Sequence, residues 1–124
     1  MAKKVLYTPE EARVLSVLQD RARKGKTISY SELITQAKLK FNMENPNERG
    51  LIGSLLGQVS RKEFEQGRPM ISCLVISNGT NMPGKGFFDL AETLYDISIN
   101  NSDAQLKFFV DEMNKTIDFW KSKK

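Results

Sequence analysis

The sequence predicts an α+β fold that is mainly helical: a winged helix-turn-helix-like domain with a small β-hairpin and an added C-terminal helix. Three observations lead to this class. Capping signals precede four segments with helical periodicity, an aliphatic segment of strand length lies at residues 70–77, and a turn-rich loop follows it. With 124 residues, of which 40% are hydrophobic, we expect a single domain spanning residues 1–124.

The predicted helices each begin at a recognisable cap. "TPEE" places Thr8 as N-cap ahead of a proline at the first helical position, and "SYSE" and "NPNE" repeat the pattern at Ser29 and Asn45. The third helix should run to about Phe64. A fourth capping box, "SDAQ", places the start of the C-terminal helix at Ser102.

Apolar residues in the third and last helices recur with a period near 3.6, which predicts a buried face on each. In the third helix the predicted buried residues are Leu51, Ile52, Leu55, Leu56, Val59 and Phe64. In the last helix they are Leu106, Phe109, Val110, Met113, Ile117 and Trp120, which favours a core or a dimer seam.

Between these helices, "PMISCLVIS" is rich in aliphatic and β-branched residues and predicts a mostly buried strand at residues 70–77. Asn78–Gly86 would form the wing, and "GFF" would pair back as the second strand of the hairpin. "DLAETLY" predicts a further helical turn or two. Cys73, on the buried strand, is expected to pack in the core.

The composition limits the function. The chain has no histidine, so Ser-His-Asp and Cys-His catalysis and His-rich zinc sites are excluded, and we expect a non-enzymatic protein without a cofactor or metal. Residues 1–62 hold 12 Lys/Arg against 6 Asp/Glu, whereas residues 63–124 hold 7 against 9. The basic half favours an anionic partner, with a merely solvated basic surface as the alternative.

The expected location is the cytoplasm. No stretch approaches the roughly 18 apolar residues of a membrane span, and the N-terminal segment lacks the apolar region of a signal peptide. A single cysteine also gives no sign of an oxidising compartment.

The third helix carries a strip of three glycines, Gly50, Gly53 and Gly57, at spacings of three and four. Glycine in a helix interior costs roughly 1 kcal/mol relative to alanine, so the strip needs a reason. Close approach of backbone is the usual one, either to another part of the chain or to a partner subunit, a ligand or nucleic acid.

The loop "NMPGKGFFD" lacks the spacing of a Walker phosphate loop, but its glycines can present backbone amides to an anion. We expect it to form one wall of a ligand site together with the glycine strip, the alternative being that these residues only make a turn. The candidate ligand-binding residues are Arg49, Gly53, Gly57, Arg68, Ser72, Gly84, Lys85, Gly86 and Phe87.

Two resemblances support this interpretation. "ISYSEL", "NERGLIGSLLG", "RPMISCLVISNG" and "GKGF" occur in the order of the DNA-binding half of alkyltransferase-like proteins, to which the chain is distantly similar. The Pro-Cys-His-Arg acceptor motif of that family is replaced here by Pro69-Met70-Ile71-Ser72, so the resemblance implies a winged-helix shape and not alkyl transfer.

Residues 41–91 more closely resemble small uncharacterised bacterial and phage proteins. Their pattern includes "GRP-x-x-S-x-(V/L)-V" and "PG-x-GFF-x-LA", found here at Gly67–Val75 and Pro83–Ala91. The position of Lys85 is not always basic among them, so the resemblance does not require a lysine for phosphate binding.

Three functions follow as hypotheses. The first is a binding protein for a phosphate-bearing nucleotide ligand, either a sensor or a phage-type protein that sequesters a nucleotide signal. The second is winged-helix binding of double-stranded DNA, and the third is a protein-interaction module that forms a homo-oligomer through the C-terminal helix.

Overall fold

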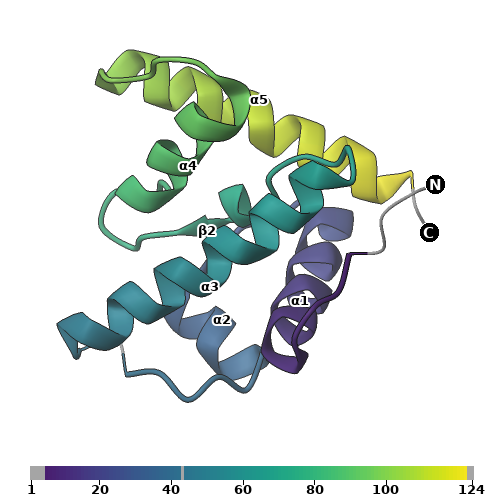
Figure 1. The fold of residues 1–124 in the computed structure, drawn as a ribbon, viewed down its shortest axis with the longest axis vertical. Helices are drawn as coiled ribbons and strands as arrows, with labels where there is room; N and C mark the ends of the chain where they lie inside the picture. Colours follow the sequence, from purple (N-terminus) through teal and green to yellow (C-terminus); the bar gives the residue numbers. More distant parts are fainter. Residues whose placement is uncertain (1–4, 43, 123–124) are drawn as a thin grey trace.

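The computed structural model describes residues 5–42 and 44–122, and within them the chain forms a mainly helical α+β fold (Figure 1). The elements, in chain order, are α1 (Pro9–Lys24), β1 (Ile28–Ser29), α2 (Tyr30–Gln36), α3 (Pro46–Glu65), a 3₁₀ helix η1 (Ile71–Leu74), β2 (Val75–Ile76), α4 (Lys85–Tyr95) and α5 (Ser102–Lys121).

Side chains cap four of these helices, and three of the caps are those predicted. Thr8 and Ser29 form reciprocal capping boxes, and the Asn45 side chain accepts the amide of Asn47. The prediction for α5 is wrong by one residue. Its N-cap is Asn101, whose side chain accepts the amide of Ala104 at 2.8 Å.

The predicted strand at residues 70–77 is mostly wrong, because only Val75 and Ile76 are extended and the preceding residues form η1. Side chains of helices satisfy the amides that a strand would have paired. Glu112 accepts the amide of Met70 at 2.8 Å, and Ser60 accepts the amide of Ser72 at 3.0 Å. The segment can therefore stay buried without a neighbouring strand.

The predicted β-hairpin is also wrong within the described residues. β2 pairs in parallel with β1, with Ile28 opposite Val75. "GFF" lies in the first turn of α4, because Phe87, Phe88 and Ala91 have helical spacing and together form its buried face. The wing segment becomes a tight turn in which Ser77 donates its amide to the Met82 carbonyl, so the fold does not confirm a winged helix.

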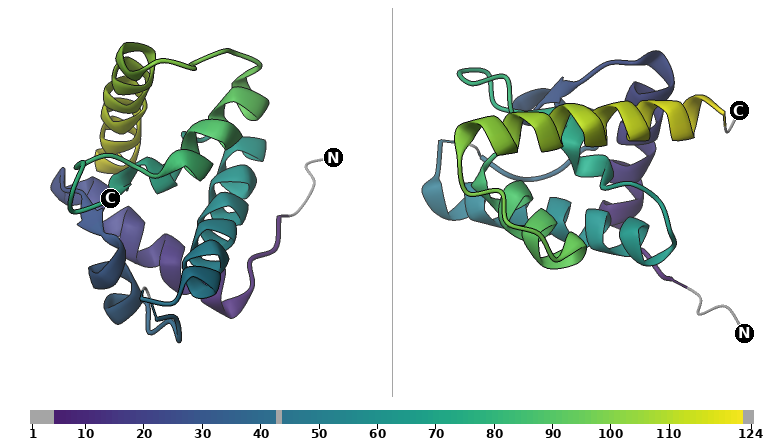
Figure 2. Two further views of the ribbon diagram at one scale, coloured as in Figure 1. Left: turned by 90° about the vertical axis from the view of Figure 1, so that its left-hand side faces the viewer. Right: turned by 90° about the horizontal axis from the view of Figure 1, so that it is seen from above.

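One hydrophobic core joins these elements, and η1 lies near its centre in contact with α1, α3 and α5. α3 crosses the front of the molecule with α4 on one side and α1 on the other, and α5 passes over the top (Figures 1 and 2). The buried part of α3 matches the prediction at Ile52, Leu56 and Val59. Leu51, however, is 54% exposed.

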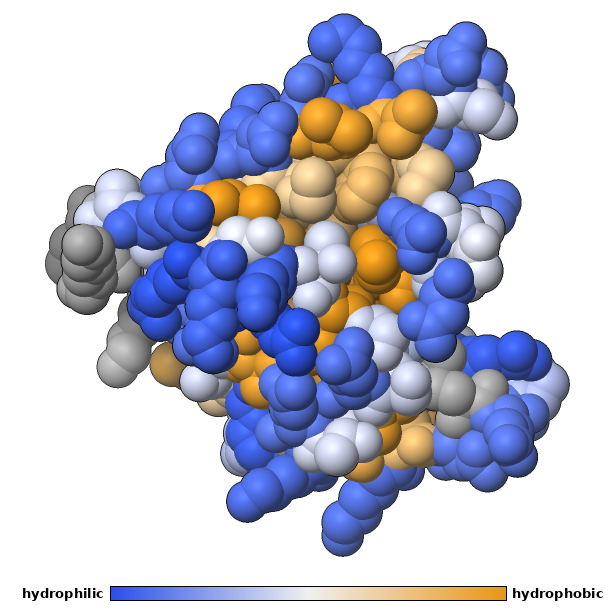
Figure 3. All heavy atoms as spheres, turned by 180° about the vertical axis from the view of Figure 1, so that it is seen from behind, coloured by the Kyte–Doolittle hydropathy of each residue, from blue (hydrophilic) through white to orange (hydrophobic). Residues whose placement is uncertain are grey.

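The buried face of α5 is centred on Phe109, Glu112, Thr116 and Trp120. Leu106 and Val110, which were predicted to share it, are 50% and 38% exposed. Seen from behind, the molecule exposes groups of apolar side chains between hydrophilic ones (Figure 3). Homo-oligomerisation through α5 stays a prediction.

Candidate functional site

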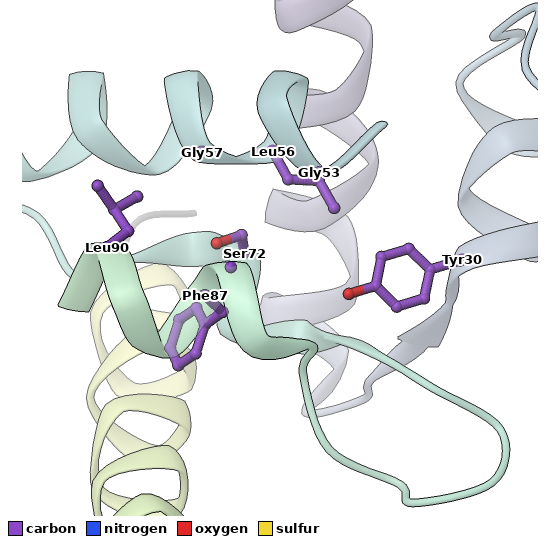
Figure 4. A pocket seen from close by; sticks show the side chains of 8 residues that line it. Tyr30, Gly53, Leu56, Gly57, Ser72, Phe87 and Leu90 are labelled. Carbon is purple, nitrogen blue, oxygen red and sulfur yellow. The ribbon is translucent and has the colours of Figure 1, made fainter. Parts of the chain in front are cut away.

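A wide hollow beside the glycine strip lies between α3 and the start of α4. This outer groove has a volume of about 550 Å³ and is lined by Tyr30, Arg49, Gly50, Ile52, Gly53, Ser54, Ser77, Gly84 and Gly86. A smaller inner pocket of about 60 Å³ shares Tyr30, Gly53 and Gly86 with the outer groove, and its other lining residues are Leu56, Gly57, Ser72, Phe87 and Leu90 (Figure 4). A hollow of the outer groove's size is typical of small-molecule sites.

Glycines of α3 form one wall of the groove. A methyl group added at Gly50 or Gly53 would meet no atom within 4 Å, and one at Gly57 would only touch Leu90 at 3.8 Å. Close packing within the described chain therefore does not require glycine at the first two positions. Glycine at these two positions lowers the stability of the helix, and a need to keep the space open for a ligand would explain why it is there.

The opposite wall is the N-terminus of α4. Its N-cap is Gly84, no side chain caps it, and no acidic residue lies in its first turn. The first amides of a helix lack intrahelical partners and carry a partial positive charge, which favours an anion. Gly86, in this first turn, lines both the outer groove and the inner pocket.

Tyr30 joins the two walls. It opens α2, immediately after β1, and its hydroxyl accepts the amide of Gly84 at 3.2 Å. The ring lines both hollows, and Figure 4 shows its hydroxyl pointing toward the start of α4. The hydroxyl hydrogen is free to donate, because the bond to Gly84 uses only the oxygen.

Arg49 supplies a cation at the edge of the outer groove and also lines a neighbouring hollow with Ser31, Ser77 and Asn78. Its side chain has no hydrogen bond or ion pair with any described residue. None of the described residues lining these hollows is acidic. The local charge therefore favours an anion.

Seven of the nine predicted ligand-binding residues line these hollows: Arg49, Gly53, Gly57, Ser72, Gly84, Gly86 and Phe87. Lys85 does not. Its side chain is 87% exposed and pairs with Asp89 at 2.7 Å along α4, a contact that raises the pKa of the lysine.

Arg68 lies elsewhere, at the C-terminal end of α3. Its guanidinium binds both carboxylate oxygens of the buried Glu63, with Nε–Oε1 at 2.9 Å and Nη2–Oε2 at 2.6 Å. Tyr7 donates its hydroxyl to the same carboxylate, and burial together with this bond raises the pKa of Tyr7 to about 12. Arg68 thus has a structural partner and is not part of the groove.

The sequence prediction missed Tyr30, Ser77 and Leu90, which also line the hollows. Tyr30 occurs in the "SYSE" capping motif, but nothing local indicates that its hydroxyl reaches a residue 54 positions away. Ser77 and Leu90 flank the glycine loop, and proximity in sequence is the only signal that could have suggested them.

Cys73 is fully buried, as predicted, and its sulfur lies 3.4 Å from the Thr116 hydroxyl. Burial raises the pKa of the thiol to about 12. We expect the thiol to resist a disulfide reagent at pH 8, reacting at least ~100-fold slower in the native protein than after unfolding in guanidinium, because thiolate is the reactive form. Absorbance of the released chromophore measures both rates, and rapid native reaction would show that Cys73 is accessible.

The described part of the chain contains neither a three-residue metal-binding group nor a membrane-spanning helix. Its His, Cys, Asp and Glu side chains form no group of three that could hold a metal ion. No helix among residues 5–42 and 44–122 combines the length and the apolar character needed to cross a bilayer.

No family model matches this chain, and comparisons with curated proteins and with solved structures also give no match. The groove between α3 and α4 is therefore the feature from which a function can be inferred.

Proposed function

We propose that the protein binds a phosphate-bearing small molecule of nucleotide size in the groove between α3 and α4, without chemical conversion. One observation carries this proposal. Arg49, the start of α4, which no side chain caps, and the glycines Gly50 and Gly53 of α3 all line one hollow, and none of the described residues lining it is acidic. Such a protein would act as a sensor or would sequester a nucleotide signal.

The two parts of the groove suit the two parts of such a ligand. The outer groove offers a guanidinium, helix N-terminal amides and the Ser77 hydroxyl, which are groups that bind phosphate. The inner pocket has apolar walls from Leu56, Phe87 and Leu90, which suit a less polar group. A ligand with a phosphate at one end and a ring at the other would satisfy both.

Thermal unfolding in the presence of pyrophosphate and of nucleoside mono-, di- and cyclic phosphates tests the function directly. A ligand present at 100 times its Kd should stabilise the native state by about 2.7 kcal/mol and raise the Tm. If neither pyrophosphate nor any nucleotide raised the Tm, the proposal would be wrong.

Arg49→Ala should weaken phosphate binding about 10- to 100-fold, because a hydrogen bond to a charged group contributes about 1.5–3 kcal/mol. Isothermal titration with the best nucleotide of the thermal screen measures the change. Arg61→Ala is the matched control: Arg61 is an exposed arginine of the same helix that lines none of these hollows. Equal losses in both variants would mean that general surface charge, not the groove, binds the anion.

Binding of double-stranded DNA is a second candidate, favoured by the exposure of Gly50, Gly53 and Ser54 on α3. Small residues allow a helix to approach a nucleic-acid backbone closely, and Arg49 lies beside them. Duplex binding would fall steeply with salt because phosphate contacts release counterions. Fluorescence anisotropy of a labelled duplex between 50 and 200 mM salt (~fourfold range) separates the candidates, since absent or salt-insensitive binding argues against DNA.

A further inference from the structure

The inner pocket is too small to hold an aromatic ring. Its volume is about 60 Å³, whereas a cavity of roughly 150 Å³ is known to hold benzene. A ring lying in the outer groove can therefore place only an edge, or one substituent, into the pocket. The chemistry of the pocket decides which substituent fits.

Ser72 is 5% exposed, and Figure 4 shows its side chain between α3 and α4. The Ser60 hydroxyl accepts the amide of Ser72 at 3.0 Å and donates to the Ser72 oxygen at 2.5 Å. The hydrogen of the Ser72 hydroxyl has no acceptor among the described residues, so it is left to donate toward the pocket.

Tyr30 provides a second hydroxyl of this kind on the opposite side of the pocket. Its oxygen accepts the amide of Gly84, and its hydroxyl hydrogen has no acceptor in the described chain. Two hydroxyl groups whose oxygens already accept a hydrogen bond thus line a pocket whose remaining side chains are Leu56, Phe87 and Leu90.

We propose that the inner pocket recognises a carbonyl oxygen on the ring of the bound ligand, with the Ser72 hydroxyl as the specificity-determining donor and the Tyr30 hydroxyl as a second one. The ligand class is therefore an oxo-substituted heterocycle that carries a phosphate. This inference rests on the proposed function, since the phosphate has to anchor the ring in the outer groove.

An amino group in place of the carbonyl fits poorly. It could donate only to the second lone pair of the Ser72 oxygen, which already accepts from Ser60, and it would leave the Ser72 hydrogen without an acceptor. A buried donor left unpaired costs about 1–3 kcal/mol. Sites with buried polar groups discriminate strongly against ligands that cannot pair with them.

Matched nucleotides test this discrimination. Inosine and adenosine 5′-monophosphates differ by a carbonyl against an amino group, and the adjacent ring nitrogen carries a hydrogen only in the oxo member; uridine and cytidine 5′-monophosphates differ in the same way. We expect the oxo member of at least one pair to bind the wild-type protein about tenfold tighter by isothermal titration. In Ser72→Ala the ratio within that pair should fall to within about twofold.

The ratio is informative even if Ser72→Ala lowers stability, because both nucleotides are measured on the same folded protein. Ser16→Ala, which removes an exposed hydroxyl of α1 outside both hollows, is the control and should keep the wild-type ratio. Tyr30→Phe should reduce the ratio in the same direction as Ser72→Ala. Pyrophosphate, which has no ring, should bind wild-type protein and Ser72→Ala equally.

Two results would overturn the inference and leave the proposed function standing: wild-type protein that binds the oxo and amino members equally, or an oxo preference that persists in Ser72→Ala. Binding of pyrophosphate without binding of any of the four nucleotides would likewise overturn the ring-edge recognition alone. If neither pyrophosphate nor a nucleotide bound, the proposed function would fall and the inference with it.

Discussion

Replacing Gly53 with leucine is expected to stabilise the fold and abolish ligand binding in the same protein. Leucine is favoured over glycine in a helix interior by about 0.8 kcal/mol, and a side chain at this position starts in open space. The free energy of unfolding in urea should therefore rise by about that amount. The leucine side chain would occupy the junction of the outer groove and the inner pocket, so nucleotide binding should weaken about 100-fold or more.

Two further variants make this result specific. Gly53→Ala should give a similar gain in stability with a smaller loss of affinity, since a methyl group fills less of the groove. Gln58→Leu adds leucine to an exposed position of α3 outside the groove and should bind normally. If the Gly53→Leu variant bound nucleotide with wild-type affinity, the glycine wall would not face the ligand.

A gain in stability coupled to a loss of function would explain why the strip contains glycine. Positions that trade stability for activity are typical of binding and catalytic sites. The strip was visible in the sequence because an interior helix glycine is costly wherever it occurs. What the sequence does not show is that the space beside Gly50 and Gly53 is empty, since that depends on where α4 begins.

The fold was predictable where contacts are local. The caps of α1, α2 and α3 join residues two or three positions apart, so their motifs identify them. The strand prediction failed because the amides of Met70 and Ser72 are satisfied by side chains 42 and 12 positions away. An aliphatic segment with distant side-chain acceptors has the same local pattern as a buried strand.

The candidate site was likewise predictable only where the sequence signal is local. Residue type and spacing predicted that glycines, Arg49 and the loop before α4 would lie together, whereas nothing local predicted that Tyr30 reaches Gly84 across 54 positions. Arg68 lies outside the groove for a different reason. Its partner Glu63 lies only five positions earlier, but the pair forms across the end of α3, where helical spacing gives no guide to the contact.

Arg68→Ala is expected to destabilise the protein strongly while leaving ligand affinity unchanged. Glu63 is fully buried, and removal of the guanidinium leaves its carboxylate with the Tyr7 hydroxyl as its one remaining side-chain partner among the described residues. Loss of one member of a buried ion pair typically costs about 3 kcal/mol or more. Chemical unfolding measures the loss, and titration of the folded protein below its Tm measures nucleotide affinity.

A double-mutant cycle tests whether the loss of stability comes from the unpaired Glu63 carboxylate. Glu63→Gln removes the charge and keeps an oxygen that can accept the Tyr7 hydroxyl, so Arg68→Ala should cost about 1 kcal/mol or less in that background. The difference between the two costs is the coupling energy of the pair. Should Arg68→Ala instead retain wild-type stability and lose nucleotide binding, Arg68 would belong to the ligand site, and the assignment of the anion to the groove between α3 and α4 would be wrong.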